Sequence, residues 1–399
     1  MSRVPAIRFK GFTDPWEQRK LGELCTISKG HGYSKADIRD VGTPLILYGR
    51  LYTQYESRIE NVDTFAVEQE GSLLSKGNEV IVPASGETVE DIAVASSVRR
   101  SGIIFGGDLN VVTPVSKLDP DYIALAITYS KAHDDLAKRA QGKSVVHVHG
   151  NDIAEVEIPY PSESEQKRIS TVVLDLDSLI ILHQRKYDKL CTVKKSMLDK
   201  MFPKPGEFVP EIRFEGFTDP WEQRKLGNFG EVAMCKRIYK DQTAENGDVP
   251  FFKIGTFGGE PDAFISEELF EDYRERFSFP KRGTLLVSAA GSIGRIVEYQ
   301  GQKAYFQDSN IVWLEHGGNL DDGFLKQLYS KIKWGLEGST IKRLYNKDIL
   351  DAEVVIPEVT EQIQIGAFFL QLDHLITLHQ RKLELLKNIK KSLLDKMFV

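Results

Sequence analysis

Residues 165–202 read EQKRISTVVLDLDSLIILHQRKYDKLCTVKKSMLDKMF, and residues 361–398 repeat them as EQIQIGAFFLQLDHLITLHQRKLELLKNIKKSLLDKMF, with 22 of 38 positions identical. In both copies apolar residues recur at spacings of three and four: Ile169, Val172, Leu176, Leu179, Leu190, Val193 and Met197, then Ile365, Phe368, Leu372, Leu375, Leu386, Ile389 and Leu393. This is heptad periodicity, and both stripes pass through a histidine, His183 or His379. Each copy therefore predicts one long helix, roughly 57 Å in length at 1.5 Å per residue.

The most direct partner for each predicted helix is the other copy of it. An apolar stripe this long extends beyond the surface of a single small domain, so the helix needs a partner of similar length. We therefore predict an antiparallel coiled coil about a pseudo-twofold axis. The alternative is two separate amphipathic helices, each lying on its own domain, and the periodicity alone leaves it open.

A second repeated block precedes each helix. Residues 7–22 read IRFKGFTDPWEQRKLG and residues 212–227 read IRFEGFTDPWEQRKLG, which differ only at Lys10/Glu215. Between the blocks lie two segments that resemble each other weakly, so we predict two similar domains on a duplicated frame. The expected order is a first domain (1–160), a first long helix (161–202), a linker (203–211), a second domain (212–357) and a second long helix (358–399).

Both divergent segments mix short β-rich runs with helical stretches, which predicts the α+β class. The expected strands are Pro44–Tyr48, Glu79–Val82, Ile103–Phe105, Val111–Val112, Pro250–Ile254, Leu285–Ser288 and Ile311–Leu314. The expected helices are Asp121–Lys138 and Asp321–Gly335.

Composition limits the class of protein. The chain has 399 residues, of which 41% are hydrophobic and 28% charged, as in ordinary water-soluble globular proteins. No apolar run approaches the roughly 20 residues of a membrane span, and the first residues lack the apolar core of a signal peptide. Three scattered cysteines suit a reducing compartment, so we expect a cytoplasmic protein. The net charge of −6 argues only mildly against nucleic acid, because an average can hide local basic patches.

No catalytic signature is present in the sequence. GxGxxG, the Walker phosphate loop, HExxH and GxSxG are all missing. His147 and His149 stand two residues apart on an extended segment without a cluster of other ligands, which does not favour a metal site. We therefore predict a binding protein with no metal and no catalytic residue of its own.

Two loops at matching places in the divergent segments carry residues suited to nucleic acid. Residues 142–153 read GKSVVHVHGNDI and residues 338–349 read GSTIKRLYNKDI. Small residues allow close approach, and basic, hydroxyl and amide groups contact phosphates and base edges. With similar runs elsewhere, the candidate DNA-contacting residues are Tyr48, Arg50, Tyr52, Thr53, Lys143, Ser144, His147, His149, Lys253, Ser288, Ser292, Arg295, Thr340, Lys342, Arg343 and Tyr345. Each alone is better explained as an ordinary turn or surface position, and only the matching sets favour recognition.

In this order of blocks the chain resembles the specificity subunits of type I restriction-modification systems, over nearly all of its length. The resemblance rests on the paired RFxGFTDPWEQRKLG openings and on LYGRLYTQY at 47–55. PFFKIGTF at 250–257, LLVSAAGSIG at 285–294 and the paired endings through LHQRK to LDKMF complete it. It implies two target-recognition domains, separated by an antiparallel pair of long helices, that each read one half of a bipartite, asymmetric double-stranded DNA target.

The resemblance also implies partners. Two methyltransferase subunits carrying S-adenosylmethionine would dock on the helices, and ATP-driven restriction subunits could join, while the chain itself would bind no cofactor. Two other classes of protein stay open. A stand-alone DNA-binding regulator would bind its site tightly without partners, and a non-DNA scaffold would show no salt-dependent DNA affinity.

Overall fold

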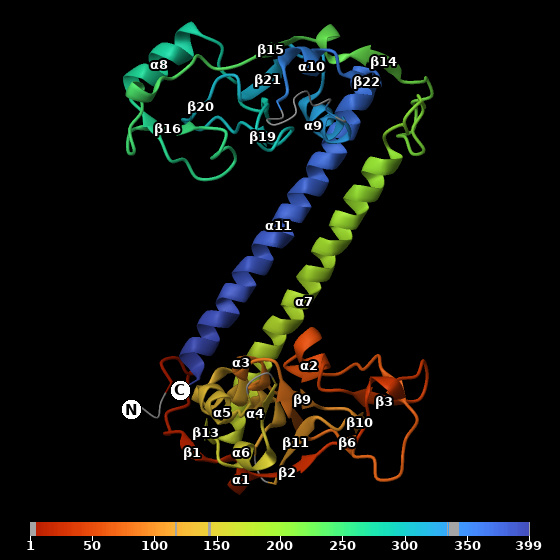
Figure 1. Ribbon diagram of the computed structural model, residues 1–399, viewed down its shortest axis with the longest axis vertical. Helices are drawn as coiled ribbons and strands as arrows, with labels where there is room; N and C mark the ends of the chain where they lie inside the picture. Colours follow the sequence, from red (N-terminus) through yellow and green to blue (C-terminus); the bar gives the residue numbers. More distant parts are fainter. Residues whose placement is uncertain (1–4, 116–117, 143–144, 333, 335–342, 399) are drawn as a thin grey trace. The chain divides into compact units, whose positions relative to one another are not determined.

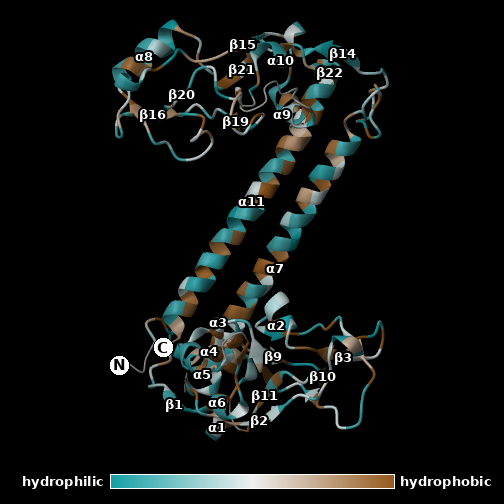
Figure 2. Ribbon diagram, viewed as in Figure 1, coloured by the Kyte–Doolittle hydropathy of each residue, from teal (hydrophilic) through white to brown (hydrophobic). Residues whose placement is uncertain are grey.

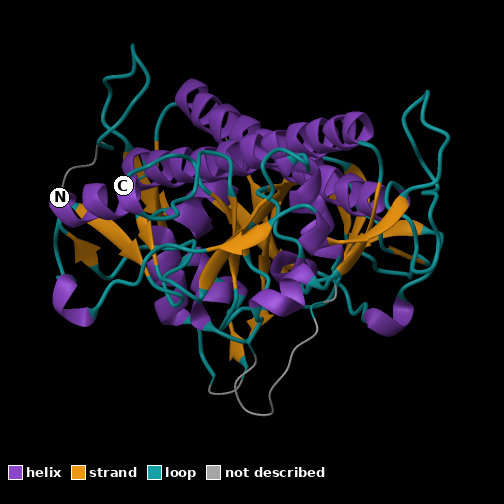
Figure 3. Ribbon diagram, turned by 90° about the horizontal axis from the view of Figure 1, so that it is seen from above, coloured by secondary structure: helices purple, strands orange, loops and turns teal. Residues whose placement is uncertain are grey.

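The computed structural model describes residues 5–115, 118–142, 145–332, 334 and 343–398. The chain folds as two compact units, Met1–Arg185 with Gln380–Val399, and Lys186–His379. Each unit contains a mixed α+β domain and half of each long helix, so the predicted fold class is confirmed (Figure 1). Figure 3 shows the strands, short helices and connecting loops of both domains.

The first unit has two sheets, in the orders β2-β11-β7-β9-β4 and β5-β3-β10-β6, and the strand pairs β1-β13 and β12-β8. The strands are β1 (Glu17–Lys20), β2 (Cys25–Lys29), β3 (Thr43–Ile46), β4 (Arg58–Ile59), β5 (Phe65–Ala66), β6 (Leu74–Lys76), β7 (Glu79–Pro83), β8 (Ser85–Gly86), β9 (Ser96–Val98), β10 (Ser101–Phe105), β11 (Leu109–Pro114), β12 (Val146–His147) and β13 (Glu157–Tyr160). The short helices are α1 (Leu21–Leu24), η1 (Lys35–Asp37), α2 (Arg50–Thr53), α3 (Val89–Ile92), α4 (Pro120–Tyr129), α5 (Lys131–Arg139) and α6 (Gly150–Ala154).

The second unit has sheets in the orders β15-β21-β18-β19 and β17-β16-β20, and the pair β14-β22. The strands are β14 (Glu222–Lys225), β15 (Glu231–Ala233), β16 (Val249–Phe252), β17 (Phe264–Ile265), β18 (Leu285–Ser288), β19 (Ile296–Glu298), β20 (Tyr305–Phe306), β21 (Ile311–Glu315) and β22 (Glu353–Ile356). The short helices are η2 (Leu226–Asn228), η3 (Lys240–Gln242), α8 (Glu267–Arg276), α9 (Asp322–Lys331) and α10 (Asn346–Leu350).

The strand registers show that the two domains share one fold. In the first, Ile46 of β3 lies beside Phe105 of β10 in parallel pairing. In the second, Phe252 of β16 lies beside Phe306 of β20, also in parallel. The opening blocks also pair in the same way in both domains. β1 pairs with β13, and β14 pairs with β22, over four residues each and both antiparallel. The duplication expected from sequence therefore extends into the segments whose sequences have diverged.

The two long helices are α7 (Glu163–Lys200) and α11 (Val359–Met397), as the heptad stripes predicted. In the first unit Ile169 and Val173 of α7 share a core with Leu394 and Met397 of α11, which places the start of one helix against the end of the other. The second unit has the converse arrangement, with Ile365 and Phe369 of α11 in one core with Met201 and Phe202. Within each unit the helices therefore pair antiparallel, as expected.

The two halves of the seam also carry equivalent ion pairs. In the first unit Lys390 Nζ lies 2.6 Å from Asp177 Oδ1, and in the second Lys194 Nζ lies 2.6 Å from Asp373 Oδ1. The two aspartates and the two lysines are each related by the repeat offset of 196 residues. The repeated sequences thus form the same ion pair within each unit.

The seam register expected in the middle of the helices was wrong. Leu179, Leu375 and Ile389 are 43%, 40% and 40% exposed. The buried row shares Leu372 and half-buried His379 with the expected row, but half-buried Ile376 takes the place of Leu375, and buried Leu383 was not expected. Both rows fit a period near 3.5, and packing against the partner helix rather than hydrophobicity selects between them.

The helix expected over Asp121–Lys138 is two helices, α4 and α5. Ser130 divides them, because its hydroxyl donates to the Ala126 carbonyl at 2.6 Å and accepts the Ala132 N–H at 3.1 Å. It thus closes one helix and caps the next. The second expected helix, Asp321–Gly335, is observed as α9, which begins after the N-cap Asp321 and ends at Lys331.

Each opening block is fastened to the start of a long helix by a buried ion pair. Arg8 Nε and Nη2 donate to Glu165 at 2.9 and 2.7 Å, and Arg213 donates to Glu361 at 2.9 and 2.6 Å. The glutamate side chains are 1% exposed and the arginines 10%. Hydrogen bonding to the carboxylate raises the pKa of each guanidinium, so these are permanently charged, bidentate contacts.

Among the described residues, no helix combines the length and apolarity that crossing a membrane requires.

Candidate nucleic-acid interface

In the first domain, strand β8 pairs with β12 and so holds the candidate loop at 142–153. Their antiparallel pairing places His147 opposite Ser85, and His147 Nδ1 lies 3.0 Å from Ser85 Oγ. The Val148 N–H donates to the Ala84 carbonyl at 3.1 Å and extends the pairing. The side chains of His147 and His149 are exposed, so both are presented outward from a fixed backbone.

Two tyrosines complete this cluster. The Tyr52 hydroxyl donates to the Ser85 carbonyl at 2.5 Å, and its ring meets that of Tyr48 edge-on with centroids 6.1 Å apart. Burial raises the pKa of Tyr52 well above its ordinary value, so the phenol stays a neutral donor. Tyr48 is 38% exposed. Two candidates, Tyr52 and His147, therefore contact Ser85, and Tyr48 packs against Tyr52. Ser85 was missed from the sequence because the second domain has Ala290 at the equivalent position.

Arg50 and Thr53 are placed differently. The Arg50 guanidinium donates to Glu56 at 2.8 Å, to Asp63 at 2.9 Å and to the Asn61 carbonyl at 2.9 Å, and it is 10% exposed. Thr53 Oγ1 donates to the Gly49 carbonyl at 3.0 Å. The charge of Arg50 is neutralised within the domain, which favours a role in holding the loop that follows α2.

The second domain repeats the first cluster on the same backbone. Ala290 and Arg343 form an antiparallel bridge, and the Leu344 N–H donates to the Ala289 carbonyl at 2.8 Å. Arg343 Nη2 donates to the Ser309 carbonyl at 3.2 Å, and its guanidinium carbon lies 5.9 Å from the centroid of the Tyr345 ring. Tyr345 is 50% exposed. The predicted residues Arg343 and Tyr345 are thus adjacent at the surface.

The loop after β18 lies next to this bridge. Ser288 is 1% exposed and acts inside the loop, where it accepts the Arg295 N–H at 2.9 Å and donates to the Ser292 carbonyl. Ser292 and Arg295 are exposed, and Arg295 Nη2 donates to the Gly258 carbonyl at 3.2 Å. Lys253 forms an exposed ion pair with Asp262 at 2.8 Å. Ser288 is therefore a positioning residue, whereas Ser292 and Arg295 are accessible.

Four further candidates, Lys143, Ser144, Thr340 and Lys342, lie outside the described residues.

The matched geometry assigns equivalent positions in the two domains. His147 and Arg343 occupy the same place in the bridge, opposite Ser85 and Ala290. Two residues later, the backbone N–H groups of His149 and Tyr345 donate to Asp152 and Asp348 at 2.9 and 2.7 Å, and each residue caps a short helix, α6 or α10. The backbone contacts are the same, and the exposed side chains differ.

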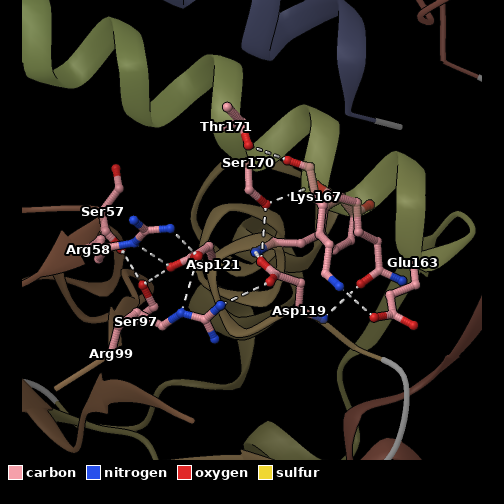
Figure 4. A network of polar contacts seen from close by, with 12 residues as sticks. Ser57, Arg58, Ser97, Arg99, Asp119, Asp121, Glu163, Lys167, Ser170 and Thr171 are labelled. Carbon is pink, nitrogen blue, oxygen red and sulfur yellow. Dashed lines mark hydrogen bonds and ion pairs between the residues drawn. The ribbon is translucent and has the colours of Figure 1, made fainter. Parts of the chain in front are cut away.

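A buried polar network stiffens the first domain (Figure 4). Asp121, 2% exposed, accepts hydrogen bonds from Arg58 Nε at 2.9 Å and Ser97 Oγ at 2.5 Å. Arg99 lies 3.3 Å from Asp119 and 3.4 Å from Asp121. Burial alone would raise the pKa of Asp121, but these hydrogen bonds and the charge of Arg99 hold it below its ordinary value. The network joins strands β4 and β9 to the start of α4.

Glycines replace this network in the second domain. Gly323 and Gly366 stand where the first domain has Asp121 and Ser170. A Cβ on Gly366 would lie 2.1 Å from Asp321 Oδ1, and one on Gly323 would lie 3.0 Å from the Gly366 Cα, so the backbones of α9 and α11 approach closely there. The contact between α9 and α11 is therefore made by close backbone approach at this point, in addition to the buried ion pair that both domains share.

Comparison with known proteins gives consistent results. The family model described as "Type I restriction modification DNA specificity domain" matches residues 13–191 and again 218–388. A specificity subunit of the type I restriction enzyme MjaIX from Methanocaldococcus jannaschii is 24% identical over 410 residues, covering 96% of this chain and 92% of the relative. A type I specificity subunit from Haemophilus influenzae is 51% identical over 143 residues, which span 35% of this chain and 37% of that relative.

Among solved structures, the S subunit of a type I restriction-modification system from M. genitalium matches 99% of both chains with a TM-score of 0.60 at 15% identity. At this identity the match concerns the fold alone. It agrees with the duplicated domains and long helices described above.

Proposed function

The chain belongs to the family of type I restriction-modification DNA specificity subunits, and on this basis we propose that it reads a bipartite, asymmetric DNA sequence for a type I complex. Residues 1–160 and 212–357 would be the two readers, residues 161–202 and 358–399 the helical frame, and residues 203–211 the linker. The chain would contribute no catalytic step. Methyl transfer would use S-adenosylmethionine held by methyltransferase subunits, and ATP would be used by restriction subunits.

The observation that carries the proposal is the pair of equivalent bridges. His147 and Arg343 are held by the same backbone pairing but offer different hydrogen-bonding groups. A duplicated reader with identical side chains would favour a symmetric target, as symmetric dimers do. Different side chains at equivalent places favour two different half-sites instead.

Exposed leucines on the helices support docking of two similar partners. Leu179 and Leu182 of α7 are 43% and 46% exposed, and their counterparts Leu375 and Leu378 of α11 are 40% and 38% exposed. Figure 2 shows hydrophobic and hydrophilic segments alternating along both helices. Exposed apolar side chains at a helical spacing of three are typical of a surface that binds another protein. Two equivalent pairs would provide one such surface for each of two methyltransferase subunits.

Stoichiometry tests this docking arrangement. We expect L179D/L182D to reduce the number of bound methyltransferase subunits from two to one, and L375D/L378D to do the same at the other surface. Analytical ultracentrifugation of the co-expressed complex measures the ratio. Substitution of the exposed polar neighbours Ser178 and Thr377 by alanine serves as the matched control. If both double variants still bind two methyltransferase subunits, the docking surfaces do not lie at these leucines.

DNA recognition is tested by binding and by methylation. The complex of the chain with its methyltransferase subunit should shift a specific duplex across a salt series, and affinity should fall as salt rises. Sequencing of methylated adenines in host DNA should give one bipartite, non-palindromic motif. Replacing residues 23–160 by the equivalent region of a relative should change one half of that motif only. Tight specific binding by the chain alone would indicate a regulator, and absence of salt-dependent binding would indicate a scaffold.

A further inference from the structure

Among the described residues Arg343 has no acidic partner, whereas most arginines of its domain form an ion pair. Its Nη2 donates to the Ser309 carbonyl, and the Tyr345 ring lies beside its guanidinium. Within the described residues no carboxylate forms an ion pair with it, whereas Arg237, nearby in the same domain, pairs with Asp308 at 2.8 Å. A guanidinium has five N–H donors, so most of those of Arg343 remain for an external acceptor.

The position of Arg343 is fixed from several sides. The bridge to Ala290 and the Leu344–Ala289 hydrogen bond hold its backbone. Ser309, whose carbonyl accepts from it, has a φ of 60°, a conformation that a non-glycine residue adopts only where its surroundings fix it. The guanidinium is thus placed before any ligand arrives, which lowers the entropy cost of binding.

We propose, resting on the DNA-reading function above, that Arg343 selects a guanine in the half-site read by the second domain. Two parallel N–H groups of a guanidinium match O6 and N7 of guanine in the major groove, and no other base offers that pair of acceptors. The same side chain could meet a phosphate, but a phosphate contact carries no sequence information. Tyr345 and Ser309 hold the plane of the Arg343 guanidinium in one orientation. This favours contact with a base over contact with a phosphate, because a bidentate contact with a base needs a defined orientation.

His147 holds the equivalent position in the first domain and has a different capacity. Its Nδ1 is occupied by Ser85 Oγ, which leaves Nε2 as a single donor or acceptor. One hydrogen bond cannot reproduce the paired contact of Arg343. The proposal therefore assigns the two residues to opposite halves of the target, with guanine selected by arginine in only one of them.

The test uses the full chain co-expressed with its methyltransferase subunit, and the readout is the methylated motif from sequencing. R343H installs the residue of the first domain, and R343K keeps the charge but removes the parallel donors. Both should relax preference for guanine at one position, by about 5- to 150-fold, and leave the other half of the motif unchanged. H147R should alter the other half only.

Three results would overturn the proposal: an unchanged motif in R343H and R343K, a motif with no guanine in the affected half, or a uniform loss of affinity over all sequences. The last, with a salt slope reduced by about one, would assign Arg343 to a phosphate. R343K guards against loss of folding, since it retains the charge and the aliphatic stem, and intact complexes are confirmed by gel filtration. If the unsubstituted complex has no specific motif, the proposed function itself fails.

Discussion

At the scale of single residues, Arg8 and Arg213 hold the opening blocks against the starts of the long helices. Each forms a buried bidentate pair with a glutamate, Glu165 or Glu361, that is 1% exposed. Removing the arginine leaves a buried carboxylate without its partner, which costs about 3–5 kcal/mol. We expect R8A and R213A to destabilise their own domains by amounts similar to each other.

Hydrogen exchange read by mass spectrometry localises this effect without assuming two-state unfolding. R8A should accelerate exchange in peptides from β13 and the start of α7, and R213A in those from β22 and the start of α11. R19A, which removes an exposed pair with Glu17, is the control and should change stability by less than about 1 kcal/mol. Equal exchange in R8A and R19A would show that the buried pair does not fasten the block.

Asp121 gives a prediction about pH. Its pKa is held below the ordinary value, so its ionised form stabilises the folded state at pH values above about 4, the ordinary pKa of aspartate. That contribution is lost as pH falls through the lower, folded-state pKa. We expect D121N to lower the melting midpoint at pH 7 and to flatten its decline below pH 4.

The control for this prediction is D135N, which removes an exposed pair with Arg139 and should leave the pH profile unchanged. Melting curves of both variants and the unsubstituted protein between pH 3 and 7 give the comparison. Parallel declines in D121N and the unsubstituted chain would remove Asp121 as a source of acid sensitivity.

Arg50 and Arg343 show how far the sequence alone could identify residues of the candidate nucleic-acid interface. Both were expected at the interface on residue type and loop position. Arg50 is neutralised by Glu56, in the loop before β4, and by Asp63, in the loop after β4. The paths of these loops are set by tertiary packing that periodicity does not report. Arg343 could be matched to His147 from the aligned loops alone. Each residue precedes, by the same number of positions, an aspartate (Asp152 or Asp348) that accepts a backbone hydrogen bond at the start of a short helix.

At the scale of elements, the long helices could be predicted and their register could not. Heptad spacing over each repeated stretch was enough to predict α7 and α11. Leu179 and Leu375 are as apolar as their buried neighbours, so hydrophobicity alone assigned them to the seam, yet both are exposed. Which of two adjacent rows is buried depends on the partner helix, and the hydrophobicity of one helix alone does not report it.

Charge reversal across the seam tests the antiparallel pairing. Asp177 and Lys390 are 22% and 16% exposed, so like charges there are poorly screened. We expect D177K and K390D each to destabilise the first unit, and the double variant to recover part of the loss. The coupling measured by a double-mutant cycle should be about 0.5–3 kcal/mol. Recovery should be incomplete, because Asp177 also accepts the Ser57 hydroxyl at 2.9 Å.

The equivalent pair, D373K with K194D, is the matched experiment in the second unit. It should give coupling of the same sign, since Lys194 and Asp373 are 27% and 25% exposed and lie at the same 2.6 Å. Urea midpoints of the four single and two double variants supply both cycles. Strictly additive effects in both units would mean that these side chains do not pair in solution.

At the scale of the whole molecule, the C-terminal end of each long helix packs in the unit in which the other long helix begins. Phe398, after α11, stacks on Tyr122 in the first unit with centroids 5.8 Å apart. Phe202, after α7, stacks on Phe324 in the second unit at 5.4 Å and meets Trp221 at 5.7 Å. The two helix ends share the sequence LDKMF, so the receiving sites accept the same residues.

This equivalence predicts that residues 1–202 alone form a twofold dimer. The Met201–Phe202 end of each copy would occupy the site beside Trp16 and Tyr122 that Met397 and Phe398 fill in the full chain. Each buried phenylalanine would contribute about 1.5–3 kcal/mol, and the paired halves of α7 would supply the seam. Sedimentation equilibrium should give twice the mass of the half-chain.

F202D in the half-chain is the control and should shift the equilibrium to monomer, because it places a charge in an apolar site. The outer face of the domain would be unchanged, so circular dichroism should report the same secondary structure in both proteins. With a methyltransferase subunit, the dimer should methylate a palindrome built from one half of the full target, since both readers are then identical. A half-chain that is folded but monomeric would mean that the two sites that hold the helix ends are not interchangeable. The divergence of the domains would then extend from the loops proposed to read DNA into the sites that hold the helices.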